Sequence, residues 1–191
     1  MSETADMEKK IILASASPRR RELMTLITDE FEIITADVDE TIAEGTSPED
    51  AVMQLSFKKA QAVSEKHKGR TVIGADTVVV CDGSILGKPE NREHACRMLK
   101  MLSGREHSVL TGVTITDGEK TDTFFVSSDV TFFDLTDEEI LQYASGGEPD
   151  DKAGAYAIQG KGSLFVEKIN GDYFNIVGFP VSEVNRHLKM F

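Results

Sequence analysis

The sequence has few cysteines and no long apolar run. Only two of its 191 residues are cysteines, Cys81 in an apolar segment and Cys96 in a helical one. This scarcity favours buried free thiols in a reducing cytosol over a disulfide or a metal site. No apolar run approaches the roughly 20 residues that a membrane span needs, and the polar start MSETADMEKK has no features of a signal peptide. We therefore predict a soluble, cytoplasmic protein with no membrane partner.

Basic residues are also scarce. The chain has 21 lysines and arginines against 33 aspartates and glutamates, which gives a formal net charge of −12. A general nucleic-acid surface needs a broad positive field, so this balance argues against a nucleic-acid polymer as a partner. A local basic cluster in such an acidic chain indicates instead a pocket for an anion.

Several common nucleotide and hydrolase motifs are missing. The sequence has no Walker A motif and no dinucleotide-binding glycine motif, which argues against a P-loop or Rossmann nucleotide site. It has no Gly-x-Ser-x-Gly elbow, so serine-hydrolase chemistry has no support. The histidines lack metal-ligand spacing, and we assign no role to any of them: His67, His94, His107 and His187.

No repeat, low-complexity tract or linker divides the chain. We predict a flexible N-terminal extension over residues 1–10 and one α/β domain over residues 11–191. Helices are expected over residues 18–27, 48–67, 91–102 and 136–143, and from about residue 182 onward. Strands are expected over residues 11–14, 31–36, 71–81, 84–86, 107–116, 120–133, 163–169 and 173–177. Tight hairpins are indicated at Asp82-Gly83, Asp117-Gly118 and Asn170-Gly171, so the sheet should be mixed rather than doubly wound and parallel.

The segment ILASASPRRREL, residues 11–22, joins a short apolar strand to the start of a helix. Ser17 is a suitable N-cap and Pro18 a suitable first helical residue. A helix start leaves backbone N–H groups free and carries partial positive charge, so cations there are unfavourable unless an anion binds. The pattern therefore predicts a phosphate site beside three consecutive arginines: Arg19, Arg20 and Arg21.

Asp76 interrupts the apolar segment VIGADTVVV, where a carboxylate buried without a partner would be costly. On pattern alone it is either a hydrogen-bonded structural residue or a metal ligand or general base that faces a cleft. Glu40, in the acidic segment DVDET, is able to share a divalent cation with Asp76, and a solvated acidic loop is an equal alternative. Without further evidence, Lys59 and Lys88 are surface lysines by default.

Four blocks of the sequence occur together in one known family. They are LASASPRRRELM, VIGADTVVVCDGSILGKP, MLKMLSGREHSVLTGV and DKAGAYAIQGKGSLFVEKINGDYFNIVGFP. In this order, and over essentially the whole chain after residue 10, they resemble the Maf family of nucleoside triphosphate pyrophosphatases. The resemblance implies an inosine-triphosphatase-like α/β fold, with an elongated mixed β-sheet flanked by helices and a central cleft between two lobes. It also implies hydrolysis of a nucleoside triphosphate substrate to the monophosphate and pyrophosphate, with a divalent metal cation, Mg²⁺ or Mn²⁺, as cofactor.

The family's phosphate-binding positions have counterparts in this sequence. Ser15, Arg19 and Arg20 match its phosphate-binding turn, whereas Arg21 lies outside that motif and should be exposed. The family's lysines that contact phosphate correspond to Lys59 and Lys88.

The resemblance also assigns the acidic and base-contacting positions. Glu40 and Asp76 match the family's acidic pair as metal ligands, and Asp76 is expected to be the catalytic proton acceptor. Thr77 and Gln159, together with Arg19, match positions associated with the choice of base.

The block DKAGAYAIQG resembles the branch of the family that acts on dTTP and UTP, and it leaves modified pyrimidine nucleotides open as substrates. Two alternatives stay open: a non-hydrolysing nucleotide-binding regulator of cell division, and a pyrophosphatase of the same fold with purine specificity, such as for 7-methyl-GTP. Asp76 favours an enzyme, because binding alone needs no base inside an apolar strand. The sequence leaves the oligomeric state open, with a homodimer as one option.

Overall fold

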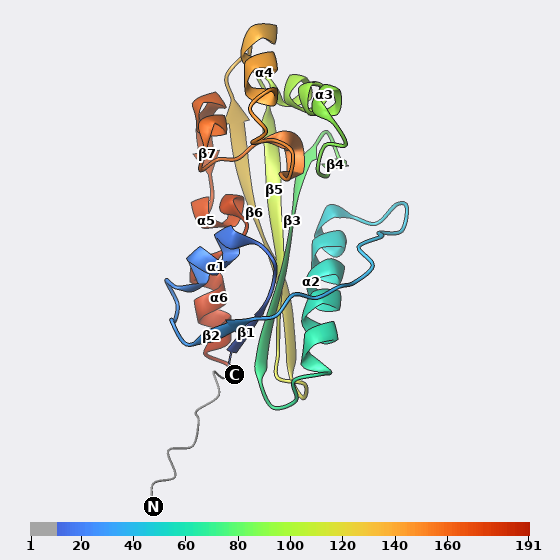
Figure 1. Ribbon diagram of the computed structural model, residues 1–191, viewed down its shortest axis with the longest axis vertical. Helices are drawn as coiled ribbons and strands as arrows, with labels where there is room; N and C mark the ends of the chain where they lie inside the picture. Colours follow the sequence, from blue (N-terminus) through green and yellow to red (C-terminus); the bar gives the residue numbers. More distant parts are fainter. Residues whose placement is uncertain (1–10) are drawn as a thin grey trace, which may run out of the picture.

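The computed structural model describes residues 11–191, so the expected extension over residues 1–10 lies outside the described part. Three long strands run along the longest axis of the molecule (Figure 1): β3 (Thr71–Cys81), β5 (Glu106–Thr116) and β6 (Thr121–Phe132). The shorter strands are β1 (Ile11–Ala14), β2 (Phe31–Ile33), β4 (Ser84–Leu86) and β7 (Val166–Asn170). The helices are α1 (Pro18–Met24), α2 (Pro48–Ser64), α3 (Arg92–Leu102), α4 (Asp137–Ala144), α5 (Tyr173–Val177) and α6 (Val181–Leu188), with 3₁₀ helices η1 (Ala153–Ala155) and η2 (Lys161–Phe165).

All seven strands within residues 11–191 belong to one mixed sheet, as predicted. The order is β2-β1-β3-β5-β6-β7, with β4 paired to β3. Strand β1 is parallel to β2 and β3, and the pairs β3–β4, β3–β5, β5–β6 and β6–β7 are antiparallel. Helices α3 and α4 gather near one end of the long strands, and α1, α6, β1 and β2 lie toward the other, which gives the molecule two lobes (Figure 1).

One edge of β3 is interrupted. Strand β5 occupies the first edge of β3 without a break from Val72 to Val80. On the second edge, pairing with β1 ends at Gly74, and pairing with β4 begins at Val79. Residues 75–78 therefore have no strand beside them on this edge within the described sheet. Their backbone groups need other partners, because buried peptide groups are almost always hydrogen-bonded.

Helix α2 packs closely on one face of the long strands. A Cβ atom at Gly74 would lie 2.4 Å from the Ser56 carbonyl oxygen, and one at Gly112 would lie 2.3 Å from the Val52 carbonyl oxygen. Glycine at both positions therefore lets the helix backbone lie directly on the sheet. Since Asp76 pairs with Gly112 across β3 and β5, this contact also fixes the distance between α2 and Asp76.

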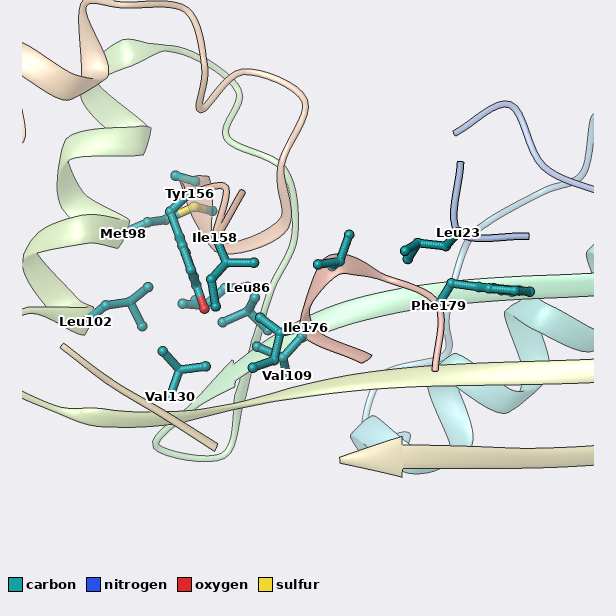
Figure 2. Close-up of a cluster of buried hydrophobic side chains, with 14 of the residues drawn as sticks. Leu23, Leu86, Met98, Leu102, Val109, Val130, Tyr156, Ile158, Ile176 and Phe179 are labelled. Atoms are coloured by element: carbon teal, nitrogen blue, oxygen red, sulfur yellow. The ribbon is translucent and has the colours of Figure 1, made fainter. Parts of the chain in front are cut away.

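The main hydrophobic core lies on the other face of the sheet and extends into the lobe with α3 and α4. Figure 2 labels ten members of this core, which come from helices, strands and the segments that connect them: Leu23, Leu86, Met98, Leu102, Val109, Val130, Tyr156, Ile158, Ile176 and Phe179. A smaller cluster lies under α2 and contains Ile12, Ala14, Ala60, Val63 and Val72. Both faces of the central strands are thus covered, which explains their nearly continuous apolar sequences.

Most predicted helix starts are confirmed. Ser17 and Ser47 are N-caps, each followed by proline, and Thr136 and Glu139 form the expected capping box. The hairpins at Asp82-Gly83 and Asp117-Gly118 are also present. Cys81 is buried and Cys96 is half-buried, and both are free. Within residues 11–191, no helix combines the length and apolarity that a membrane crossing requires.

The prediction of a third hairpin at Asn170-Gly171 is wrong. Residues 173–177 form helix α5 instead of a strand, and residues 163–165 belong to η2, so that β7 begins only at Val166. The Asp172 side chain accepts a hydrogen bond from the Phe174 N–H and caps α5, which ends at Gly178 with φ 117°. Residues 173–177 are all aromatic, aliphatic or amide residues, so their periodicity does not distinguish a strand from a helix. The cap at Asp172 favours the helix.

Candidate active site

Every residue that the family resemblance assigned to the site lines one pocket. The pocket has a volume of about 770 Å³, within the usual range for a small-molecule site. Its lining includes Ser15, Arg19, Arg20, Glu40, Lys59, Asp76, Thr77, Lys88 and Gln159. The structure thus brings together segments that are as distant in the chain as Ser15 and Gln159.

The interrupted edge of β3 explains why neighbouring residues on a strand line the same pocket. Successive side chains of a strand point to opposite faces of the sheet. Asp76 points to the face covered by α2, where it meets Lys59, whereas Thr77 points to the opposite face, where it meets Arg20. Because no strand covers residues 75–78 on the open edge, the pocket reaches both faces around this edge.

Lys59 bridges the two acidic residues. Its Nζ lies 2.6 Å from Asp76 Oδ1 and 2.8 Å from Glu40 Oε1. The Lys59 and Asp76 side chains are only 12% and 14% exposed, whereas Glu40 is 60% exposed. The hydrogen bond from Lys59 lowers the pKa of Glu40 below its usual value. The contact with Lys59 thus favours the ionised form of Glu40.

The acidic pair also fits a divalent cation. A single ammonium group already touches both carboxylates, so one small cation in the same region can reach both as well. Carboxylate oxygens are the hard ligands that Mg²⁺ and Mn²⁺ prefer. Within residues 11–191, no group of three or more histidine, cysteine, aspartate or glutamate side chains is placed to hold a metal. The remaining ligands would therefore come from substrate phosphates and water.

Arg20 is committed largely to the protein itself. Its Nε donates to the Gly178 carbonyl oxygen at 2.8 Å, and its Nη1 donates to the Ala75 carbonyl oxygen at 2.9 Å. Nη2 donates to Thr77 Oγ1 at 2.9 Å, and a longer bond of 3.4 Å joins Nη1 to Ser15 Oγ. Burial lowers the pKa of the Arg20 guanidinium, and the negative charge of Asp76 opposes this effect. Arg20 therefore ties α1, the open edge of β3 and the end of α5 together.

The neighbouring basic residues are available to a ligand, because no hydrogen bond or ion pair within residues 11–191 involves the side chain of Arg19 or Lys88. Arg19 and Lys88 line the pocket, and Lys88 is exposed. Arg21 is exposed and lies outside the pocket lining, as predicted. Gln159 is also exposed, and no hydrogen bond within residues 11–191 involves its side chain. The side-chain amide of Gln159 is therefore available to a ligand.

An acid and a base that no sequence pattern singles out line the same pocket. Asp151 and Lys152 line it and contact each other, with Lys152 only 14% exposed. The backbone N–H of Gly154 donates to the Gly87 carbonyl oxygen at 3.1 Å, which holds this loop beside Lys88. The run of charges in EPDDKAG resembles any solvated loop, so only the fold shows that it faces the pocket.

The chain is similar to known proteins along almost its whole length. The family model described as "Maf-like protein" matches residues 10–191. A Bacillus mycoides protein named dTTP/UTP pyrophosphatase is 53% identical over 183 residues, which cover 96% of each chain. A Bacillus cereus protein of the same name is 52% identical with the same coverage.

Among solved structures, the Staphylococcus aureus Ham1 protein matches with a TM-score of 0.52. The match covers 94% of this chain and 98% of that one, at 15% identity. At this identity the likeness concerns the fold alone, and it confirms the expected inosine-triphosphatase-like fold.

Proposed function

The chain belongs to the Maf family, and we propose that it is a nucleoside triphosphate pyrophosphatase that acts on dTTP and UTP. The reaction adds water across the anhydride between the α and β phosphates and releases the nucleoside monophosphate and pyrophosphate. The observation that carries the proposal is one pocket that combines Arg19, Lys59 and Lys88 with the carboxylates Asp76 and Glu40. Phosphoryl transfer depends mainly on positioning and charge neutralisation, and these side chains supply both.

Asp76 is the proposed proton acceptor for the attacking water. Lys59 donates to Oδ1 of Asp76, which leaves Oδ2 able to take a proton. Lys59 also fixes the orientation of the Asp76 carboxylate. Lys59 can do so because it belongs to α2, which packs closely on the sheet. Arg19 and Lys88 are proposed to bind the phosphates that become pyrophosphate.

A divalent cation, Mg²⁺ or Mn²⁺, is the proposed cofactor, with Glu40 and Asp76 as its protein ligands. When bound, it would neutralise negative charge on the phosphate oxygens. The proposed substrate is a free nucleotide in the cytoplasm, and the net charge of −12 supports this choice over a nucleic-acid polymer.

A pyrophosphate-release assay tests the proposal. The common and modified nucleoside triphosphates should each be supplied with Mg²⁺ or Mn²⁺ and with the metal chelated. We expect dTTP and UTP to be hydrolysed well, CTP poorly, and none without the cation. Preferred hydrolysis of 7-methyl-GTP would favour the purine alternative, and tight nucleotide binding without turnover would favour the non-hydrolysing regulator.

A further inference from the structure

A short chain of hydroxyl groups leads from the pocket wall into the core. Arg20 Nη2 donates to Thr77 Oγ1 at 2.9 Å, and Thr77 Oγ1 lies 2.9 Å from Thr111 Oγ1. Thr111 Oγ1 in turn donates to the Asn175 carbonyl oxygen at 3.0 Å. Thr77 lines the pocket, whereas Thr111 is fully buried and does not line it.

We propose that Thr111 is a positioning residue that fixes the Thr77 hydroxyl as a hydrogen-bond acceptor toward the ligand, and thereby selects bases that present a ring N–H. The inference rests on the proposed hydrolysis of dTTP and UTP and names a residue that determines its specificity. It is independent of any contact between Thr111 and the ligand.

The direction of each hydrogen bond follows from the two ends of the chain. A guanidinium group only donates and a carbonyl oxygen only accepts. Because Thr111 gives its single hydroxyl proton to the Asn175 carbonyl oxygen, Thr77 must supply the proton of the bond between the two threonines. The reverse arrangement would leave two oxygen atoms 3.0 Å apart with no proton between them. The hydroxyl proton of Thr77 is thus used inside the protein.

What Thr77 can offer a ligand is therefore limited. Of its two acceptor lone pairs, one is taken by Arg20, and the other has no donor within residues 11–191 and is available to a ligand in the pocket that Thr77 lines. A ring N–H, as in uracil and thymine, matches this lone pair. The corresponding ring nitrogen of cytosine carries no proton and would meet a second acceptor. Sites built on such hydrogen bonds reject the wrong partner strongly, because polar groups are left unpaired.

The fold holds this arrangement rigidly. Thr77 and Thr111 are directly opposite each other in the β3–β5 ladder, so their distance is set by the sheet. The side-chain amide of Asn175 donates to the Val109 carbonyl oxygen of β5 and to Ser128 Oγ of β6, both at 2.9 Å, which anchors α5 against these two strands. The position of the Asn175 carbonyl oxygen is therefore as fixed as the strands themselves.

Thr111→Val removes the acceptor and keeps the shape of the side chain. The Asn175 carbonyl oxygen would still accept from the Gly178 N–H at 2.9 Å, so the substitution leaves no buried acceptor without a partner. The hydroxyl proton of Thr77 would then be free to turn toward the ligand. We expect the ratio of kcat/KM for UTP to that for CTP to fall about tenfold, mainly through a gain with CTP.

Three further variants isolate this effect. Thr111→Ser keeps the hydroxyl and should keep the wild-type ratio within about twofold. Thr114→Val, on the same strand, removes a fully buried hydroxyl that bonds to Ser56 and Thr123 away from the pocket, and it should leave the ratio unchanged. Thr111→Ala replaces Thr111→Val if circular dichroism shows that the valine variant does not fold.

The outcomes separate this inference from the proposed function. If the wild type hydrolyses UTP but the ratio is the same in Thr111→Val or Thr111→Ala, the role of Thr111 is refuted and the function stands. An equal loss with both nucleotides would show a merely structural role and would refute it too. A wild type that hydrolyses neither dTTP nor UTP would overturn the function and this inference together. The inference is supported if the ratio of kcat/KM for UTP to that for CTP falls in Thr111→Val and keeps its wild-type value in Thr111→Ser.

Discussion

At the scale of single residues, the proposed chemistry depends on how Asp76 is held. The carboxylate is only 14% exposed and pairs with Lys59 through Oδ1, whereas no hydrogen bond within residues 11–191 uses Oδ2. A general base needs both access to water and a fixed orientation, and the ion pair supplies the second without removing the first.

Asp76→Asn should keep the fold and much of the nucleotide binding, because the amide oxygen still accepts from Lys59. Turnover should fall about 100-fold or more, since the variant cannot take up the proton. Pyrophosphate release from UTP measures the loss, and the exposed Asp82→Asn, at the end of the same strand, is the control. Near-normal turnover in a folded Asp76→Asn protein would remove Asp76 from the catalytic role.

Arg20→Ala should impair both stability and hydrolysis, because three segments of the site lose their common donor. We expect the free energy of unfolding to fall by about 2–4 kcal/mol. Arg20→Lys should be nearly as harmful, since an ammonium group cannot reproduce the planar fork. Urea unfolding and UTP hydrolysis test this, with the exposed Arg21→Ala expected to stay within about 0.5 kcal/mol of wild type. Wild-type stability in Arg20→Lys would contradict the tying role.

Some site residues can be found from sequence and others cannot. Asp76 stands out because a carboxylate interrupts an apolar strand. Thr111 does not stand out, because threonine is an ordinary strand residue and its partners are 34 and 64 positions away along the chain. The commitment of Arg20 to backbone carbonyl oxygens is equally hidden, since it depends on where β1 stops pairing with β3.

At the scale of elements, the contact between α2 and the sheet determines the distance between Lys59 and Asp76. Lys59 comes from α2 and Asp76 from β3, so any shift of the helix changes the ion pair. Local sequence predicts both elements well, through the cap at Ser47 and the apolar run of β3. It does not predict their separation, which depends on glycines that fall opposite the helix backbone only after folding.

Gly112→Ala should therefore damage both stability and activity. The added methyl group would lie 2.3 Å from the Val52 carbonyl oxygen, so α2 must move outward and carry Lys59 with it. We expect a loss of about 1–3 kcal/mol in unfolding free energy and a lower kcat/KM for UTP. Urea unfolding measures the loss in unfolding free energy. Gly87→Ala is the control for stability, because its added Cβ would meet nothing within 4 Å. Equal stability of the two variants would contradict close packing as the cause.

At the scale of the whole molecule, stability should depend on a buried histidine in the core. His107 is 2% exposed, and its Nε2 lies 2.9 Å from the hydroxyl of Tyr156. Its Nδ1 has no hydrogen-bond partner among residues 11–191. Burial lowers the pKa of His107 to about 4 from 6.5, so the folded protein keeps this ring neutral. The core thus favours the uncharged form over the charged one.

The consequence is a loss of stability in mild acid. As the pH falls through 6.5, the unfolded chain takes up a proton that the folded chain accepts only near pH 4. The neutral His107 ring therefore makes its full contribution to the free energy of unfolding above about pH 6.5, and this contribution is lost as the pH falls from there to about 4. We expect wild type to lose about 2–3 kcal/mol more than His107→Gln between pH 7 and pH 4.5. Urea unfolding at both pH values measures this, and parallel losses would refute it.

The open edge of β3 has a consequence for self-association. An unpaired strand edge is a template on which another chain can add a strand and begin to aggregate. Here the exposed stretch spans only residues 75–78, and β1 and β4 close it at both ends. Arg20 occupies the Ala75 carbonyl oxygen within it, and Asp76 places a charge there. The interruption is therefore too short to hold a full strand of another chain, and it leaves the side chains of Asp76 and Thr77 on the pocket wall.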